Sequence, residues 1–336
     1  MKREDRGESF LLERISAGAA DSSRILAGRG VSLGIGDDAA LFHPKPGFET
    51  ILTSDWFLEG IHFLREKHPP DAVGWKSLAR AVSDIAAMGG TPRCFLLSLA
   101  LPNSCTRRWL DLFLGGLRRA SSKFQCVLAG GDTTRQDEIL INVTVAGEVP
   151  ARRAVLRSGA NPGDLLFVSG RLGEAELGLQ IVRRAKGRAS KNNPHTKKHL
   201  YPEPRLALGQ WLSKTGLASA MMDLSDGLSS DLPRLCAASN VGARLEKVRI
   251  PQVHTPALAR EYGCEPMQLA LHGGDDYELL FTVPRRKEKG LPKTFNGVSL
   301  TAIGEITRDR KLLVLDESGL DSPLIPGGWD PFQKKL

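Results

Sequence analysis

Aspartates that stand beside glycine or at the end of an apolar run are the most informative chemistry in the sequence. They form six groups, at residues 36–38, 53–55, 83–84, 130–132, 223–226 and 273–276. Mg²⁺ prefers oxygen ligands and takes one or two carboxylates together with waters and phosphate oxygens. Aspartates that converge on one site would therefore fit several Mg²⁺ ions that bridge phosphates. Any single Gly-Asp pair is more typical of a turn, because the side chain caps nearby backbone amides.

Two of these groups give more specific evidence for a ligand site than the others do. An apolar run ends at Asp223, and Ser225 and Asp226 then open a helical pattern. Ligands bind beyond the carboxyl ends of strands, and helix N-termini offer free N–H groups to phosphate. The alternative is that Ser225 or Asp226 is only the N-cap. Asp84 lies inside a predicted helix, and its alternative role is a pair with Arg80 one turn earlier, worth about 0.2–0.5 kcal/mol.

Other catalytic signatures are missing from the sequence. It has no G-x-x-x-x-G-K-[ST] run, no G-x-G-x-x-G after a strand and no kinase H-R-D or D-F-G set. The seven histidines are dispersed, and His62, next to Phe63, favours a structural role by residue type alone. The chemistry therefore depends on carboxylates rather than on a histidine or serine dyad.

Helical and strand patterns alternate along the chain and predict an α/β or α+β protein. The spacing predicts helices over 9–15, 71–88, 106–121, 174–184, 205–213 and 227–238. Predicted strands cover 50–54, 94–101, 125–129, 139–149, 165–169 and 221–224, and further elements cover 266–271, 277–283, 299–303 and 312–316. Turn formers at 158–164 mark a boundary, so we expect two domains, 1–150 and 151–336.

Composition and charge exclude several classes of protein. The 336 residues carry a net charge of +8, which permits nucleic acid or small anions as ligands. The basic excess gathers in residues 183–199, which contain no aromatic side chain for base stacking, so we expect a solvated, mobile loop. No apolar run reaches the roughly 20 residues of a membrane span. Five dispersed cysteines without a C-x-x-C pair indicate reduced thiols in the cytoplasm.

Eight motifs in order make the chain resemble the thiamine-monophosphate kinase family. They are GIGDDAAL (34–41), TSDWFLEGIHF (53–63), SDIAAMGGTP (83–92), LAGGDTTR (128–135), RSGANPGD (157–164), DLSDGLSSDL (223–232), GGDDYELLF (273–281) and GWDPF (328–332). The resemblance implies the two-domain fold of aminoimidazole ribonucleotide synthetase, with an N-terminal α/β domain that pairs across a homodimer and a C-terminal α/β domain.

The resemblance also implies a reaction and its residues. ATP would phosphorylate thiamine phosphate to thiamine diphosphate with Mg²⁺, and neither nucleic acid nor a membrane would be a partner. The implied Mg²⁺ ligands are Asp38, Thr53, Ser54, Asp55, Asp84, Asp132, Asp223 and Asp226. The implied ATP contacts are Gly131, Asp132, Arg157 and Ser225, and the implied thiamine phosphate contacts are His62, Asp275 and Trp329. An acceptor phosphate is already ionised at neutral pH, which agrees with the lack of a catalytic base.

Some positions depart from the family pattern. Asp275 stands where the family often has Glu, and Pro331 stands where it often has His. Residues 113–115 do not identify an adenine contact, and residues 183–199 have no family role. Alternatives with the same fold are an enzyme like aminoimidazole ribonucleotide synthetase, whose D-G-V-G-T-K run is absent, and a hydrogenase-maturation protein. An RNA-binding protein is the alternative from a different class.

Overall fold

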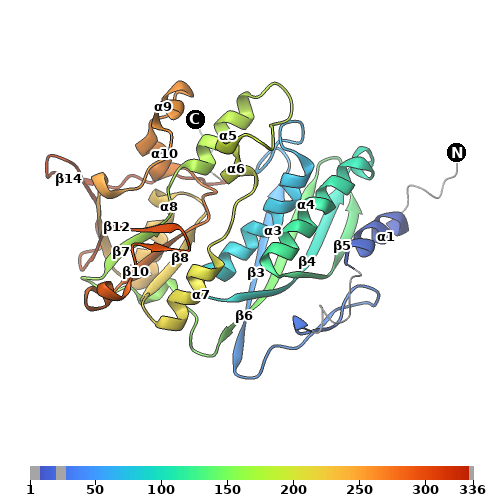
Figure 1. Ribbon diagram of the computed structural model, residues 1–336, viewed down its shortest axis with the longest axis horizontal. Coiled ribbons are helices and arrows are strands. Elements are labelled where there is room, and N and C mark those ends of the chain that lie inside the picture. The colour runs from blue at the N-terminus through green and yellow to red at the C-terminus, as the bar shows by residue number, and fades with distance from the viewer. Residues whose placement is uncertain (1–7, 20–27, 333–336) are drawn as a thin grey trace. The chain divides into compact units, whose positions relative to one another are not determined.

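The computed structural model describes residues 8–19 and 28–332, and Figure 1 shows their helices and strands. The contacts divide the chain into two compact units. Unit 1 comprises Met1–Ile85, Gly90–Arg152 and Ala185–Lys191, and unit 2 comprises Ala86–Gly89, Arg153–Arg184 and Asn192–Leu336. The chain thus passes from most of unit 1 into unit 2 between Arg152 and Arg153.

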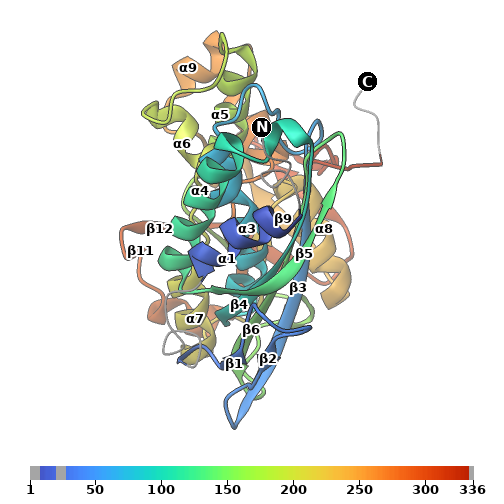
Figure 2. The same ribbon diagram turned by 90° about the vertical axis from the view of Figure 1, so that its right-hand side faces the viewer.

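Unit 1 is built on a four-stranded sheet with the order β3-β6-β4-β5. Its strands are β3 (Phe48–Leu58), β4 (Thr91–Leu101), β5 (Val127–Arg135) and β6 (Leu140–Pro150). β6 is antiparallel to both β3 and β4, whereas β4 and β5 are parallel. Helices α3 (Pro70–Ala87) and α4 (Arg108–Phe124) lie on one side of this sheet (Figure 2). Smaller elements complete the unit: α1 (Glu8–Ala19), β1 (Val31–Leu33), β2 (Leu41–Phe42) and the short helix η2 (Asn103–Cys105).

Buried and exposed side chains alternate along β3, and this pattern distinguishes the two faces of the sheet. Ile51 and Phe57 are buried on the face that α3 covers, whereas Leu52 and Trp56 point the other way and are exposed. Successive side chains of a strand point to opposite faces, so the same strand supplies a core face and an open face. We call the side away from α3 and α4 the open face.

Unit 2 is built on a larger sheet with the order β14-β13-β9-β12-β7-β10-β8, to which β11 adds beside β12. Neighbouring strands in this sheet are antiparallel, except that β9 and β13 are parallel. The strands are β7 (Leu165–Ser169), β8 (Ala220–Leu224), β9 (Gly242–Glu246), β10 (Glu278–Val283), β11 (Thr294–Phe295), β12 (Val298–Thr307), β13 (Leu312–Leu315) and β14 (Asp321–Pro323).

Helices cover both faces of this sheet, which is why β7, β8 and β10 are buried along their whole length. Alternate residues of these strands pack against α8 (Leu228–Ser239) on one side and α7 (Leu206–Thr215) on the other. The other helices are α5 (Glu174–Arg184), α6 (Pro194–Leu200), α9 (Pro256–Glu261), α10 (Pro266–His272), η3 (Arg157–Gly159), η4 (Lys247–Arg249) and η5 (Arg285–Gly290).

The predicted elements are confirmed at most positions, and one interpretation is wrong. Strand Leu165–Ser169 and helix Glu174–Arg184 have the predicted bounds. The sequence pattern does not predict strand β9, because a strand of five residues that follows the end of a helix shows little apolar periodicity of its own. The expectation of a loop over 183–199 is wrong for part of this stretch, because residues 183–184 end α5 and residues 194–199 belong to α6, whereas residues 185–193 lie between the two helices and are mostly exposed. In α6, Asn193 accepts the His195 N–H as N-cap, and Thr196 and His199 are buried.

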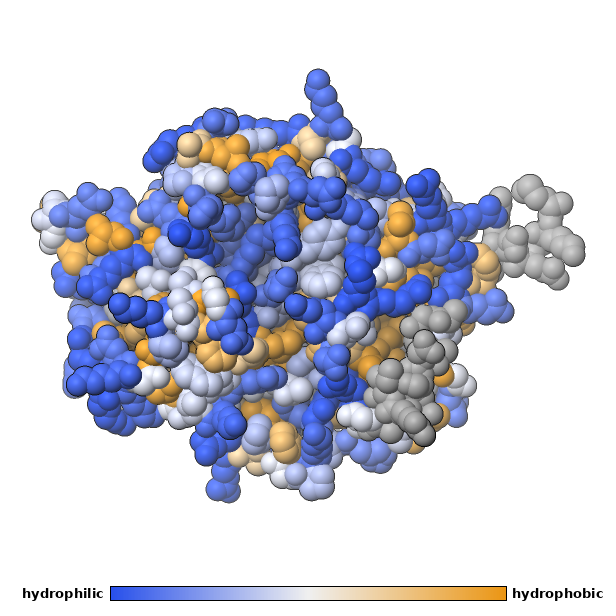
Figure 3. All heavy atoms as spheres, in the orientation of Figure 1, coloured by the Kyte–Doolittle hydropathy of each residue, from blue (hydrophilic) through white to orange (hydrophobic). Residues whose placement is uncertain are grey.

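Within the described residues, no helix is long and apolar enough to cross a membrane. On the face drawn in Figure 3, hydrophilic side chains predominate and apolar ones form scattered patches. All five cysteines are free thiols, and four of them are buried.

Candidate active site

Thr53 and Asp55 of β3 lie on the helix-covered face of unit 1, where α3 presents Arg80 and Asp84. The Thr53 hydroxyl donates a hydrogen bond to the Asp84 carboxylate. The Arg80 guanidinium lies 4.0 Å from Asp55 Oδ1 and 5.5 Å from the centre of the Phe57 ring. Three predicted metal ligands therefore share one face. Arg80, which the sequence offered only as a partner of Asp84, also stands beside Asp55.

Two other predicted ligands, Ser54 and Asp132, lie on the open face. Ser54 lies between Thr53 and Asp55 in β3, so its side chain points to the opposite face. Its hydroxyl lies 3.2 Å from Asn142 Oδ1 of β6. Asp132 is exposed and pairs in register with Ser98 of β4, which pairs in turn with Asn142. Residues directly opposite each other on neighbouring strands share a face. The side chains of Ser54 and Asp132 are thus separated by the sheet from the first three ligands.

Three further predicted residues of unit 1 are fixed by local contacts. Asp38 is exposed between β1 and β2, and its N–H donates to the preceding carboxylate at 2.8 Å. His62 is half-buried, and its Nδ1 accepts the Leu58 N–H at 3.0 Å, which leaves the proton of the neutral ring on Nε2. A Cβ on Gly131 would lie 1.9 Å from the Leu97 carbonyl oxygen, so the approach of β5 to β4 requires glycine here.

In unit 2, one buried carboxylate shapes the loop that follows β8. Asp231 Oδ2 accepts the N–H groups of Ser225 and Asp226 at 3.1 and 3.0 Å, and Asp231 Oδ1 accepts from Arg234 at 2.7 Å. Arg234 also donates to the Asp226 carboxylate. Burial, reinforced by the charge of Asp226, raises the pKa of Asp231 to about 7, against the N–H donors and Arg234. The sequence analysis missed Asp231, although the motif at 223–232 contains it.

The N-cap alternative for Ser225 and Asp226 is wrong. Gly227 is the N-cap of α8, with φ of 103°, and no side chain caps the helix. Asp223 ends up 3% exposed near the end of β8, in register with Leu279 of β10. The loop is therefore held by Asp231 from within α8 rather than by the side chains of Ser225 or Asp226.

Backbone hydrogen bonds bring two more predicted residues to this loop. The Asp275 N–H donates to the Ser225 carbonyl at 2.8 Å, and the Trp329 N–H donates to the Asp226 carbonyl at 2.9 Å. A Cβ on Gly328 would lie 2.0 Å from that same carbonyl oxygen, so glycine is needed for the close approach. Four predicted residues from three separate stretches of sequence thus lie together in unit 2.

Arg157 is not part of this group. It lies in η3, and its carbonyl accepts a hydrogen bond from the Ser239 hydroxyl at the C-terminal end of α8. Ser225 precedes the other end of that helix. A helix of 12 residues is about 18 Å long, so the main chains of these two predicted ATP contacts are well separated.

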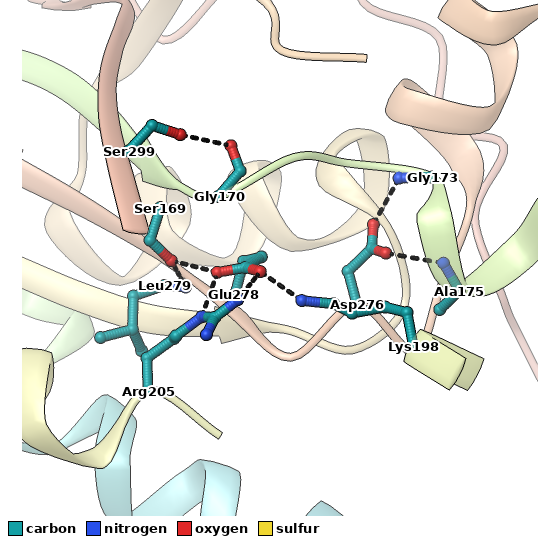
Figure 4. A network of polar contacts seen from close by, with 10 residues as sticks. All are labelled: Ser169, Gly170, Gly173, Ala175, Lys198, Arg205, Asp276, Glu278, Leu279 and Ser299. Carbon is teal, nitrogen blue, oxygen red and sulfur yellow. Dashed lines mark hydrogen bonds and ion pairs between the residues drawn. The ribbon is translucent and has the colours of Figure 1, made fainter. Parts of the chain in front are cut away.

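The acids that follow Gly274 have three different sets of partners, and Figure 4 shows those of Asp276 and Glu278. The Asp276 carboxylate accepts the N–H groups of Gly173 and Ala175, at 2.5 and 3.0 Å, at the start of α5. Glu278 is fully buried and accepts from three side chains, which are Ser169, Lys198 and Arg205. Asp275 instead accepts from the Tyr277 hydroxyl at 2.7 Å. Only Asp275 of these acids remains partly exposed.

Charge pairing decides how the two buried acids titrate. Burial alone would raise the pKa of Glu278, but Lys198 and Arg205 hold it below its usual value. Burial raises the pKa of Asp276 to about 7, although Lys198 and the two N–H donors oppose that rise. Glu278 therefore remains an anion that fixes two cations.

The donor set fits Mg²⁺ better than a softer metal. Within the part of the chain that the structure describes, no three His, Cys, Asp or Glu side chains gather into a group that could hold a metal ion. Mg²⁺ does not need such a cage, because it takes one or two carboxylates and completes its shell with waters and phosphates. The Thr53, Asp55 and Asp84 oxygens meet that requirement.

Comparisons with known proteins agree on one family. Residues 36–149 match the family model described as AIR synthase related protein, N-terminal domain, and residues 161–316 match its C-terminal domain. The thiamine-monophosphate kinase of Escherichia coli strain K12 is 38% identical over 307 residues, which cover 90% of this chain and 92% of that protein.

Solved structures agree with the sequence matches. The thiamine-monophosphate kinase of Stenotrophomonas maltophilia superposes with a TM-score of 0.80 at 33% identity, covering 94% of this chain and 98% of that one. A structure described as AaThiL complexed with AMPPCP and TMP has a TM-score of 0.75 at 32% identity and covers 99% of both chains. The chain therefore belongs to the thiamine-monophosphate kinase family.

Proposed function

We propose that the protein transfers the γ-phosphoryl group of ATP to the phosphate of thiamine phosphate, which gives thiamine diphosphate and ADP. The observation that carries this proposal is the full-length likeness to the structure complexed with AMPPCP and TMP, which we take as an ATP analogue and thiamine monophosphate. The kinase from Escherichia coli, at 38% identity, supports the same reaction.

We propose Mg²⁺ as the ion that the reaction requires. In unit 1 we assign Thr53, Asp55 and Asp84 as ligands, together with Asp38, Ser54 and Asp132. In unit 2 we assign Asp223 and Asp226. When bound, Mg²⁺ would neutralise phosphate charge, which is the main obstacle when two anions must react.

The residues of the chain bind and orient the two substrates. The partly exposed ring of Trp329 offers a face to the cationic thiazolium. His62 and Asp275 complete the proposed thiamine phosphate contacts, and Gly131, Arg157 and Ser225 the ATP contacts. Because the acceptor phosphate is ionised at neutral pH, no side chain has to remove a proton from it.

The direct test incubates the purified protein with ATP, Mg²⁺ and thiamine phosphate and detects thiamine diphosphate by chromatography. We expect product that disappears with EDTA and returns with excess Mg²⁺. A matched reaction with AMPPCP in place of ATP should give none, because its γ-phosphoryl group is joined through carbon. Folded protein that binds ATP but makes no thiamine diphosphate would contradict the proposal.

We also propose that the open face of unit 1 pairs with the same face of a second copy. Leu52, Trp56 and Leu96 are 71%, 55% and 42% exposed there. Apolar side chains gathered on one open sheet face are typical of a protein interface. Trp56→Lys should convert a dimer to a monomer in sedimentation, whereas Ile325→Lys, at a 67% exposed position in unit 2, should not. A wild-type monomer, or a Trp56→Lys dimer, would contradict this pairing.

We place the protein in the cytoplasm, because five free cysteines are typical of a reducing compartment. Fractionation of cells that express the full chain would test this, and recovery from an oxidising compartment would contradict it.

A further inference from the structure

Asp275 differs from the neighbouring acids in being left open to solvent. Its side chain is 23% exposed, whereas the side chain of Glu278 is 0% exposed. One of its oxygens, Oδ1, accepts the Tyr277 hydroxyl at 2.7 Å. Tyr277 is itself only 1% exposed, so a buried phenol holds a partly exposed carboxylate. The carboxylate is thereby fixed at one oxygen while it stays accessible.

The backbone around this pair is strained. Asp275 has φ of 66° and Tyr277 has φ of 50°, a region that bulky side chains rarely adopt. The Asp275 N–H bonds to the Ser225 carbonyl, and the Tyr277 N–H bonds to the Leu224 carbonyl at 2.9 Å. Strained residues persist where surrounding contacts over-determine them, and they cluster at functional sites. The strain here brings the Tyr277 hydroxyl back to the carboxylate two residues before it.

A second contact comes from the basic segment that had no assigned role. Lys198 of α6 donates to the buried Glu278, which anchors the end of that helix (Figure 4). The next residue, His199, is 1% exposed, and its Nδ1 lies 3.9 Å from Asp275 Oδ2. The two oxygens of Asp275 therefore each face a polar group that the fold holds in place.

We propose that Tyr277 and His199 are positioning residues that fix the Asp275 carboxylate for the cationic, amine-bearing part of thiamine phosphate. This inference rests on the proposed function. A carboxylate repels the phosphate of that substrate and attracts its thiazolium ring and its amino group. A carboxylate that is already held in one orientation loses little conformational freedom when the substrate binds. Tyr277 and His199 thus act on thiamine phosphate affinity through Asp275.

The test compares the wild type with Tyr277→Phe, which removes one hydroxyl and keeps the ring. We expect KM for thiamine phosphate to rise about tenfold, as the loss of one hydrogen bond to a charged group predicts. KM for ATP and kcat should stay within about twofold, because the hydroxyl acts through Asp275, which is a proposed contact of thiamine phosphate and not of ATP. Tyr262→Phe makes the same change at the end of α9 and serves as the matched control.

A double-mutant cycle separates positioning from a purely structural role. In an Asp275→Asn background, Tyr277→Phe should add less than about twofold to KM for thiamine phosphate, because the group it positions is gone. If Tyr277→Phe does not fold, His199→Asn replaces it in the same cycle with Asp275→Asn, and the same non-additive effect on KM for thiamine phosphate is expected. Additive effects, equal effects on both KM values, or an unchanged KM for thiamine phosphate would overturn the inference. Absence of thiamine diphosphate with the wild type would instead overturn the proposed function.

Discussion

The candidate acids of unit 1 and the acids around the unit 2 site are used in different ways. In unit 1, Asp38 and Asp132 are exposed and Asp55 and Asp84 are half-buried. In unit 2, Asp231, Asp276 and Glu278 are buried, and each accepts from backbone N–H groups or cationic side chains. The first set lies on strands, on a connection and on helix α3, whose geometry is set by other residues. The second set itself holds loops and helices together.

This difference separates acids that are available to a ligand from acids that build the site. An exposed carboxylate loses little hydration on folding, so its charge remains free to bind a cation. A buried carboxylate must be paired, and removal of its charge leaves buried partners uncompensated. Substitution of the candidate acids of unit 1 should therefore change activity, whereas substitution of Asp231, Asp276 or Glu278 in unit 2 should change stability first.

The largest expected effect is on stability, from Glu278→Gln. Glu278 is fully buried between Lys198 and Arg205, whose side chains are 22% and 21% exposed. Loss of one charge from a buried ion pair costs about 3–5 kcal/mol of the free energy of unfolding. Urea denaturation of the full chain measures this. Glu288→Gln at an exposed position of η5 is the control, and an effect no larger than the control would contradict the comparison.

The next effect is on activity, from Asp132→Asn in unit 1. Asp132 is exposed and accepts the N–H of Thr133 at 2.9 Å, and an Asn carbonyl can also accept this N–H. We expect the free energy of unfolding to stay within about 0.5 kcal/mol. Loss of a metal-ligand charge should lower activity about a hundredfold and raise the Mg²⁺ concentration required. Asp137→Asn, in the connection between β5 and β6, is the control. Full activity of Asp132→Asn would remove Asp132 from the proposed ligands.

A smaller effect follows from the titration of Asp276. Its pKa is raised to about 7 in the folded protein and is about 3.9 in an unfolded chain. Between those values the folded state keeps a proton that the unfolded state has released. The contribution of Asp276 to the free energy of unfolding therefore falls as pH rises from about 4 to 7, by up to about 1.4 kcal/mol per pH unit, and levels off above the folded pKa.

Asp276→Asn should remove this slope from the pH dependence. The difference in unfolding free energy between wild type and variant should shrink from pH 5 to pH 7 and level off only above about pH 8. Denaturation at each pH measures it, with Asp309→Asn in the β12–β13 connection as the control. A difference that grows with pH would mean that the N–H donors and Lys198 outweigh burial.

Sequence patterns predicted the core elements well and the use of individual acids poorly. The period of apolar residues identified helix α3 and strands β4 and β7, because burial alone sets that pattern. Neighbouring acids such as Asp275 and Asp276 look alike in sequence, yet they bind different partners because positive φ values turn the chain between them. That turn depends on contacts with β8 and with α5, which lie far away in the sequence.

The smallest expected effect tests whether the two faces of β3 differ in function. Thr53 bonds to Asp84 on the helix-covered face, whereas the Ser54 hydroxyl lies on the open face among β6 side chains. Thr53→Val should raise the Mg²⁺ requirement about tenfold, because Thr53 bonds to the proposed ligand Asp84, whereas Ser54→Ala should raise it by a smaller factor of about threefold. The two variants each remove one hydroxyl from adjacent positions, so each is the control for the other. An equal response to both would show that the two faces of β3 contribute equally to ion binding, and would contradict the expected difference between them.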